Sequence, residues 1–228
     1  LENLGDNYIH FDNMSLKSAL LILDIPDKEQ REMVYNCVDI DALRHAFAPK
    51  IAKFNYIQTL LPIGVPGAIP GHPRQDCDAS ILSKKWSRPL VLANWRTDNV
   101  PEMASFAKQF FLRTGMKINV LNVSAEKLAK LLHGKTKPYN LVIIMSTPDS
   151  DDNYRFLESY FGKNSLLRYK IDGIEGLYGV LSKSDDVSAQ KDMAAKIAEK
   201  IAERNAVLPL YQTVTTVYYP KGIRNFYV

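Results

Sequence analysis

The chain has 228 residues, of which 46% are hydrophobic and 24% charged, so it forms one large domain or two small ones and is long enough to bury a core. Its formal net charge of +4 is small beside 29 basic and 25 acidic residues, and the basic residues are dispersed along the chain. This excludes the basic stripe expected of a nucleic-acid-binding protein. No apolar run approaches the ~18 residues that a membrane-spanning helix needs.

The first third of the chain is predicted to hold a short strand and two helices. Residues 8–11 alternate weakly between apolar and polar, which indicates a short strand. Apolar residues recur at helical spacing across residues 28–47. Asp27 is the expected N-cap, and Gln30 completes a capping box. We expect a break near residues 39–41 to divide this segment into two helices.

Residues 62–73 are interrupted by proline and glycine at close spacing, which excludes a helix or a strand. A rigid loop of this length is a wall, a lid or a connection between lobes. The two cysteines, Cys37 and Cys77, lack the CxxC spacing of a redox or zinc motif. The sequence leaves open whether they form a disulfide or remain two buried thiols.

From Arg88 onward, predicted strands and helices alternate. Strands are expected at residues 89–94, 117–122, 141–145 and 206–213, and helices at 101–114, 124–133, 152–161, 173–181 and 187–205. Alternation of this kind predicts a parallel sheet with right-handed crossovers and helices packed on its faces. The predicted fold class is therefore α/β.

No motif for catalysis or for a cofactor is present. The sequence has no GxSxG, no HExxH and no glycine-rich loop between a strand and a helix, and none of its four histidines has a nearby serine or cysteine partner motif. The acidic run at residues 149–153 superficially resembles a calcium loop, but it lacks the glycine of the sharp turn and the acid at the twelfth position. We therefore predict no catalytic residue, no metal, no cofactor and no enzymatic activity.

The predicted ligand site follows the strand at residues 141–145. The loop after it carries Asp149, Asp151 and Asp152, at the carboxyl end of a strand, where ligands bind in open α/β sheets. One acid is needed to cap the following helix, which leaves Asp149, nearest the strand, as the candidate to hold a cationic group. Trp95 directly follows the first of these strands at the same edge, where it either joins the core or lines a cleft.

Several segments occur in an order and spacing that resemble a known family: Tyr8–Asn13, Asp27–Asp39, Leu61–Gly71, Asn94–Asp98, Gly115–Val120 and Leu208–Tyr211. Together they resemble the C-terminal part of the family 5 extracellular solute-binding proteins, the periplasmic dipeptide and oligopeptide receptors of ABC importers. The resemblance spans essentially the whole chain.

The resemblance implies a periplasmic-binding-protein-like lobe with a mostly parallel sheet and helices on both faces. Residues 1–228 would form the second of two lobes, with the first lobe absent. A strand near residues 7–13 would cross between the lobes, and the segment near 206–228 would lead back. Residues 62–73 are expected along one edge of the cleft-facing surface.

The resemblance also implies a site. In peptide-binding relatives, the loop after the third strand carries an aspartate that pairs with the α-amino group of the ligand, and the matching position is Asp149. A carboxylate and an ammonium in a desolvated cleft form a charge-assisted hydrogen bond. Ser146, Thr147, Met145 and Trp95 are the further expected ligand-binding residues.

The expected function is that of a substrate-binding component, or a fragment of one, that delivers a peptide or related solute to a membrane permease. The expected location is periplasmic or extracytoplasmic, with no signal peptide in this chain. Because the chain does not begin with Met, we interpret it as a mature or excised fragment. The alternative is a ligand-sensing domain of the same fold fused to a transcriptional regulator, which a DNA-binding segment upstream of Leu1 would reveal.

Overall fold

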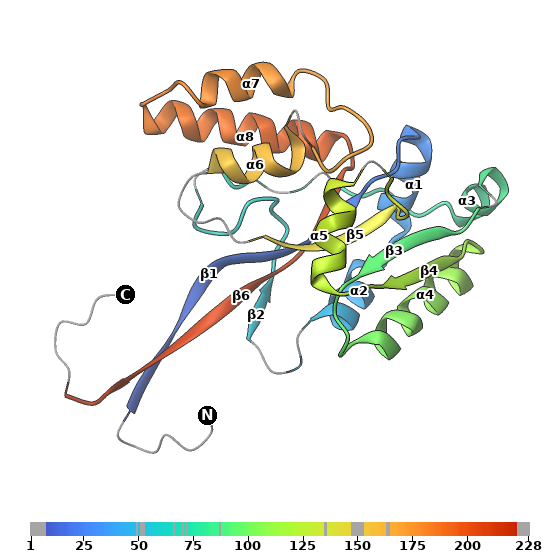
Figure 1. Cartoon of the computed structure of the whole chain (residues 1–228), viewed down its shortest axis with the longest axis horizontal. Coiled ribbons are helices and arrows are strands. Elements are labelled where there is room, and N and C mark those ends of the chain that lie inside the picture. The colour runs from blue at the N-terminus through green and yellow to red at the C-terminus, as the bar shows by residue number, and fades with distance from the viewer. Residues whose placement is uncertain are drawn as a thin grey trace.

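The computed structural model describes residues 8–222 except 49, 51–52, 66, 70, 72, 87, 135, 147–152 and 163–164. The strands are β1 (Tyr8–Leu23), β2 (Phe54–Tyr56), β3 (Leu90–Asn94), β4 (Ile118–Asn122), β5 (Leu141–Ser146) and β6 (Val207–Pro220) (Figure 1). The helices are α1 (Lys28–Cys37), α2 (Ile40–Phe47), α3 (Ala79–Lys85), α4 (Val100–Thr114), α5 (Ala125–His133), α6 (Asn153–Phe161), α7 (Ile174–Leu181) and α8 (Val187–Glu203).

The strands form one six-stranded sheet in the order β2-β6-β1-β5-β3-β4. The predicted α/β class is confirmed, and β3 pairs in parallel with both β4 and β5. The expectation of a mostly parallel sheet needs correction, because β1 pairs antiparallel with β5 and β6, and β2 pairs antiparallel with β6. Parallel pairing is thus confined to three neighbouring strands.

The central strand β1 explains this difference. The sequence predicted a strand only at residues 8–11, whereas β1 continues to Leu23 between β5 and β6. Residues 18–23 are buried throughout, because helices cover both faces of the sheet there. A strand buried on both faces reads as a continuous apolar run rather than an alternating one, so its period gives no signal.

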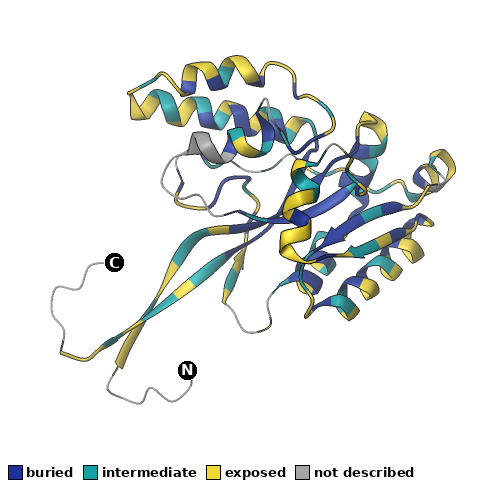
Figure 2. Cartoon of the chain, in the orientation of Figure 1, coloured by how far each residue is buried: buried dark blue, intermediate teal, exposed yellow. Residues whose placement is uncertain are grey.

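Two hydrophobic cores lie on opposite faces of the sheet. Leu20 and Ile22 of β1 pack into one core with residues of α5, α6, α7 and α8. Leu21 and Leu23 pack into the other with residues of α1, α2, α3 and α4. Successive side chains of a strand point to opposite faces, so one strand supplies both cores. Each fully buried leucine or isoleucine stabilises the fold by roughly 1.5–3 kcal/mol, and buried residues follow the middle of the sheet in Figure 2.

Local capping signals set the helix boundaries as predicted. Asp27 Oδ1 accepts a hydrogen bond from the Gln30 amide at 2.7 Å and caps α1. Asp39 caps α2 in the same way, at 3.0 Å from the Ala42 amide. Helix α4 ends at Gly115, whose φ of 69° suits a residue without a Cβ.

A two-stranded arm extends from the sheet. The outer half of β1 pairs with the outer half of β6, from Tyr8 opposite Pro220 to Met14 opposite Val214. The arm projects away from both cores (Figure 1). Because Tyr8 pairs with Pro220, the two ends of the described chain lie together at its tip. Residues on it such as Ile9 are exposed. The sequence predicted the final strand only to residue 213, because the arm has no core to impose alternation.

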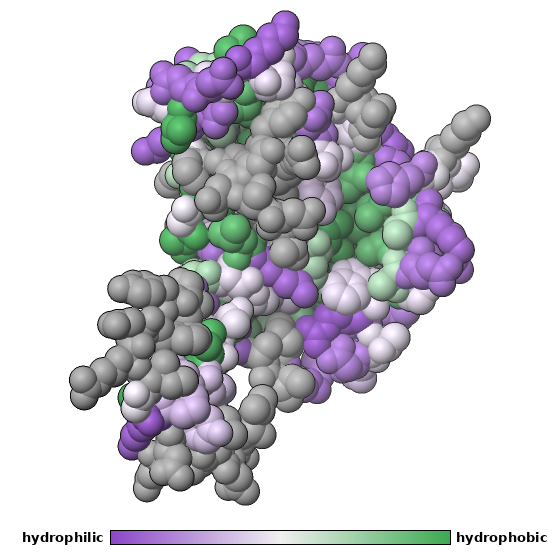
Figure 3. Space-filling view, turned by 60° about the vertical axis from the view of Figure 1, so that its left-hand side comes forward, coloured by the Kyte–Doolittle hydropathy of each residue, from purple (hydrophilic) through white to green (hydrophobic). Residues whose placement is uncertain are grey.

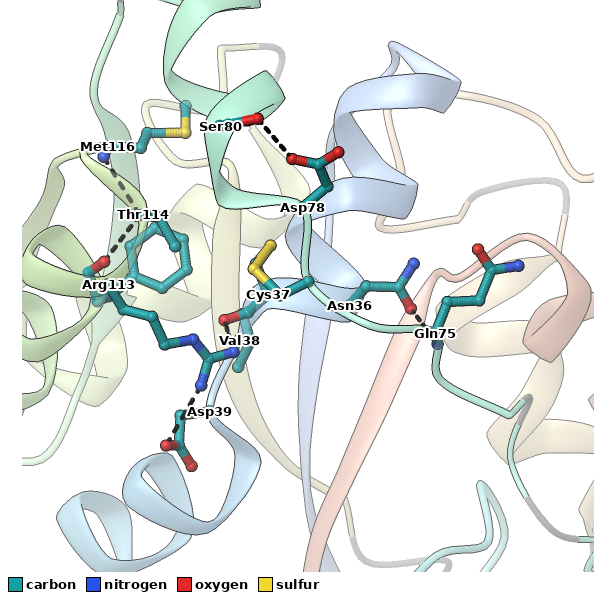
Figure 4. The surroundings of a disulfide bond; sticks show 12 residues. Asn36, Cys37, Val38, Asp39, Gln75, Asp78, Ser80, Arg113, Thr114 and Met116 are labelled. Carbon is teal, nitrogen blue, oxygen red and sulfur yellow. Dashed lines mark hydrogen bonds and ion pairs between the residues drawn. A yellow bond between two sulfur atoms is a disulfide. The ribbon is translucent and has the colours of Figure 1, made fainter.

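A disulfide joins Cys37, the last residue of α1, to Cys77, which settles the alternative that the sequence left open. Figure 4 shows the bond beside Asn36, whose Oδ1 accepts from the Gln75 amide at 3.0 Å. Arg74 donates to three main-chain carbonyls at the end of α1. These contacts attach the segment before α3 to α1.

The described residues among 62–73 form neither helix nor strand, as predicted. Buried Gln212 of β6 anchors the start of this segment: its Oε1 accepts from the Ile63 amide at 2.9 Å, and its Nε2 donates to Ser15 O at 2.7 Å. Farther along, a Cβ on Gly67 would lie 2.9 Å from Ala194 Cβ of α8. The segment therefore leads from the sheet to the surface of α8.

Candidate functional site

The candidate site lies where β3 and β5 end. The two strands are parallel neighbours, with Ala93 opposite Val142, so the residues that follow them emerge at the same edge of the sheet. Trp95 is the first residue after β3, and Met145 and Ser146 are the last of β5. Figure 3 views the molecule from the side toward which these strands point and shows hydrophobic side chains gathered in a hollow beside a hydrophilic rim.

Trp95 is half-buried, and it packs against both hydrophobic cores. Its ring meets that of Phe47, at the end of α2, edge to face, with centroids 6.0 Å apart. The sequence left open whether this tryptophan belongs to the core or lines a cleft. In the structure it lies at the boundary, with part of its surface exposed at the strand ends.

Met145 is held by a tyrosine that sequence reasoning did not single out. Tyr211 of β6 is buried, and its hydroxyl donates to Met145 Sδ at 3.7 Å. Burial raises the pKa of Tyr211 to about 12, so it remains a protonated donor at neutral pH. Tyr211 also stacks obliquely on Phe47, with centroids 6.3 Å apart. The structure thereby connects Trp95 to Met145 through Phe47 and Tyr211.

Ser146 is almost completely buried, with 1% of its surface exposed. It hydrogen-bonds to Tyr160 of α6, which counteracts the rise that burial causes in the tyrosine pKa. Its hydroxyl thus holds α6 against the end of β5. In register with it, Ser18 of β1 has a buried Oγ that lacks a hydrogen-bond partner in the described part of the chain.

Asp149 and Thr147, two of the predicted ligand-binding residues, lie outside the described residues, as do Asp151 and Asp152. The structure describes the elements before and after this loop: β5, which ends at Ser146, and α6, which begins at Asn153.

A network of side-chain amides supports this edge of the sheet, in which Asn94 and Asn99 are buried and Asn122 is exposed. Asn94 Nδ2 donates to Asn122 Oδ1 at 2.9 Å and to Asn99 Oδ1 at 3.0 Å. Asn99 Nδ2 in turn donates to Ala46 O at 3.1 Å. The ends of β3 and β4 are therefore joined to the start of α4 and to α2, and these buried polar groups have partners. The only sequence signal is an asparagine at the end of two successive predicted strands.

Arg96 is a second residue that sequence reasoning missed. It follows Trp95, and its Nη1 donates to Phe47 O at 2.8 Å. Its Nε donates to Asp98 Oδ1 at 2.9 Å, and this hydrogen bond is the main cause that raises the arginine pKa. Arg96 thus fixes the chain next to Trp95 while its charge is balanced by an exposed acid.

These observations define what the edge can do chemically. Trp95 and Met145 offer an aromatic ring and a thioether, both suited to contact with apolar side chains. Among the described residues, no group of three or more His, Cys, Asp or Glu side chains is placed to hold a metal ion. Likewise, no helix in the described part of the chain has the length and apolar character to cross a membrane.

A hollow of about 900 Å³ lies at the opposite end of β5, lined in part by Lys137 and Arg168. This hollow is therefore separate from the predicted site, which lies at the other end of β5.

No family model matches the sequence, and no curated protein matches it. Solved structures do match. HbpA2 from Haemophilus parasuis superposes with a TM-score of 0.75 at 14% identity, over 95% of this chain and 46% of that chain. The dipeptide-binding protein from Pseudoalteromonas sp. SM9913, in complex with Met-Leu, gives 0.73 at 12% identity, over 99% and 48%. The oligopeptide-binding protein AppA from Bacillus subtilis, in complex with a nonapeptide, gives 0.70 at 12%, over 98% and 50%.

The chain thus spans about half the length of the structures that it matches. At these identities the match establishes the fold alone, and it confirms the periplasmic-binding-protein-like α/β fold that the sequence resemblance implied.

Proposed function

We propose that the chain is one lobe of a two-lobe substrate-binding protein, which captures a peptide or related small solute for an ABC importer. The observation that carries this proposal is the asymmetry of coverage: nearly all of this chain superposes on half of the dipeptide-binding protein and half of AppA. A lobe of such a protein binds ligand rather than transforming it, which agrees with the lack of a catalytic motif in the sequence.

The arm supports this assignment. Tyr8 pairs with Pro220, so residues that precede β1 and residues that follow β6 leave the arm at the same point. A two-stranded ribbon alone is marginally stable in water, and this one exposes apolar residues such as Ile9. A neighbouring lobe would cover them. In this proposal, the outer half of β1, near residues 7–13, crosses between the lobes, and the segment near 206–228 returns.

The ligand site of this lobe is the edge formed by the ends of β3 and β5. Asp149 supplies the carboxylate for the ligand's ammonium group, while Trp95 and Met145 form an apolar wall; Ser146 and Thr147 lie where the loop begins. Residues 62–73 border the cleft. Because the second wall belongs to the other lobe, this surface is open rather than enclosed, and closure of the two lobes around the ligand is the expected switch.

The disulfide favours an extracytoplasmic location, since such bonds persist in oxidising compartments. It weighs against the alternative, a ligand-sensing domain fused to a cytosolic regulator. The proposed protein partner is a membrane permease, which receives the ligand.

Calorimetric titration of the 228-residue chain with di- to pentapeptides tests the proposal. We expect no tight binding by this chain alone, because affinity requires most of the ligand surface to be buried. A protein that carries both lobes should bind one peptide class with saturation. Submicromolar binding by the 228-residue chain would contradict a shared cleft.

A further inference from the structure

Strand β4 lies at the edge of the sheet, and its backbone pairs with one described strand only, β3. Its register with β3 is continuous from Ile118 to Asn122, without a bulge. The strand also contains no proline and no charged residue. Bulges, prolines and charged residues on an edge strand commonly block its pairing with another chain. Because β4 has none of these, it presents an unprotected edge.

An apolar groove of about 500 Å³ runs along this edge, between β4 and α4. The face of α4 that lines the groove adjoins the face that packs into the core through Met103, Phe106 and Phe110, and Ala107 belongs to both faces. Phe111 is 41% exposed there. The apolar lining consists of Val100, Ala104, Ala107 and Phe111 from α4 and Ile118 and Val120 from β4.

The charged residues that line the groove are both cationic: Lys108 of α4 and Lys117, which precedes β4. Within the described part of the chain, neither lysine has an ion-pair partner. The acid of α4, Glu102, pairs with Lys50. The groove therefore has unbalanced positive charge beside an apolar floor and a free strand edge.

We propose that β4 is a docking site for an extended, acidic polypeptide segment, which adds to the sheet as a strand beside β4. Its main chain pairs with the free edge of β4, as in other cases of strand addition. Alternate side chains of the segment face α4, where an apolar side chain fits between Ala104 and Phe111. Acidic side chains at its ends meet Lys108 and Lys117.

This site is distinct from the proposed peptide cleft, because it runs along β4, whereas the cleft lies at the ends of β3 and β5. Strand β4 is also at the edge of the sheet opposite β2, whereas the arm and both ends of the described chain project on the other side (Figure 1). Chain that adjoins those ends starts far from β4. Charge also disfavours pairing of β4 with β4 of a second copy of this chain, since that strand would bring another Lys117 and contains no acid.

Fluorescence anisotropy with a labelled ten-residue peptide of alternating valine and glutamate tests the proposal. We expect saturable binding, with slowed hydrogen exchange at β4 amides that do not bond to β3. The double variant Lys108→Glu, Lys117→Glu should weaken binding at least about tenfold, because two exposed attractions become two repulsions. The matched control is Lys191→Glu, Lys196→Glu on α8, which makes the same change of charge on the opposite face and should bind normally.

Several results would overturn the proposal. Equal weakening by the two double variants would show attraction to overall charge. Equal binding of a valine–lysine peptide would exclude recognition of acids. A dimer formed through β4 would identify a second copy as the occupant. Val120→Pro removes a main-chain donor at the edge; if this variant keeps its circular dichroism spectrum and its full affinity, strand addition is wrong. Should this variant unfold, hydrogen exchange in the unmodified protein is the test instead: β4 amides that exchange no more slowly with the peptide bound would contradict strand addition.

Discussion

Arg168 and Asp24, 144 positions apart in the chain, form an ion pair in which Arg168 Nε lies 2.9 Å from Asp24 Oδ2. The aspartate side chain is completely buried, and one third of the arginine side chain is exposed. Arg168 also donates to the main-chain oxygens of Asp24 and, at 2.6 Å, of Tyr139. The pair thus connects the end of β1, the approach to β5 and the segment between α6 and α7.

Arg168→Met should lower the free energy of unfolding by about 3 kcal/mol, because it leaves a buried carboxylate without its partner. Urea unfolding followed by circular dichroism measures this. Arg168→Lys is the control and should lose less, since it keeps the charge but not the fork of donors. A loss below about 1 kcal/mol for the methionine variant would equate the pair with an exposed one.

Asp24 should make stability depend on pH in an unusual direction. Burial raises the pKa of Asp24 above 3.8, although Arg168 opposes the rise. The folded state therefore binds this proton more tightly than the unfolded chain, so the contribution of Asp24 to stability is present at low pH and is lost as pH rises through the folded pKa.

Unfolding of the unmodified protein and of Asp24→Asn, measured between about pH 4 and about pH 6, isolates this contribution. The unmodified protein should gain stability relative to the asparagine variant as the pH falls. A difference that stays constant, or that grows as the pH rises, would contradict a raised pKa.

Removal of the disulfide should destabilise the chain. Cys37 and Cys77 are separated by 40 positions, and a closed loop of this length restricts the unfolded chain enough to contribute about 4 kcal/mol in the chain-entropy model. The double variant Cys37→Ser, Cys77→Ser should show this loss in urea unfolding. A reductant should lower the stability of the unmodified protein and leave that of the double variant unchanged; an equal response would attribute the effect to something other than this bond.

Asp149→Asn tests the proposed ligand contact in a protein that carries both lobes. The substitution keeps the shape and removes the charge, so a ligand with a free amine should lose roughly 2 kcal/mol of binding free energy or more. Calorimetry measures this loss, and the melting temperature should barely change. Asp151→Asn is the matched control. Equal losses from both variants would indicate the overall negative potential of the loop, and a lower melting temperature with unchanged affinity would indicate a helix cap.

Local signals account for what was predicted. Asp27 with Gln30, Ser124 and Gly115 mark helix ends through contacts within a few residues, so they act in the same way whatever surrounds them. The strands near residues 90, 118 and 141 were predicted because helices with clear ends separate them. Trp95, Met145 and Ser146 were placed at one edge on the same grounds, and the structure places them at the ends of neighbouring strands.

The pairing of distant segments was beyond such signals. Met145 meets Tyr211 because both lie opposite Ala19 of β1, which runs between β5 and β6. That position of β1 follows from its burial on both faces rather than from any period in its sequence. Strand β2 and helix α3 are too short to show a period and were missed.

By itself, then, the sequence determined the α/β alternation, the helix boundaries and the edge where a ligand site is expected, because each depends on residues close together in the chain. Only the tertiary structure decided the order of strands, the antiparallel pairing of β1, the bond between Cys37 and Cys77 and the ion pair of Asp24 with Arg168. These contacts join residues far apart in sequence, and they form because both cores must close around the same central strand.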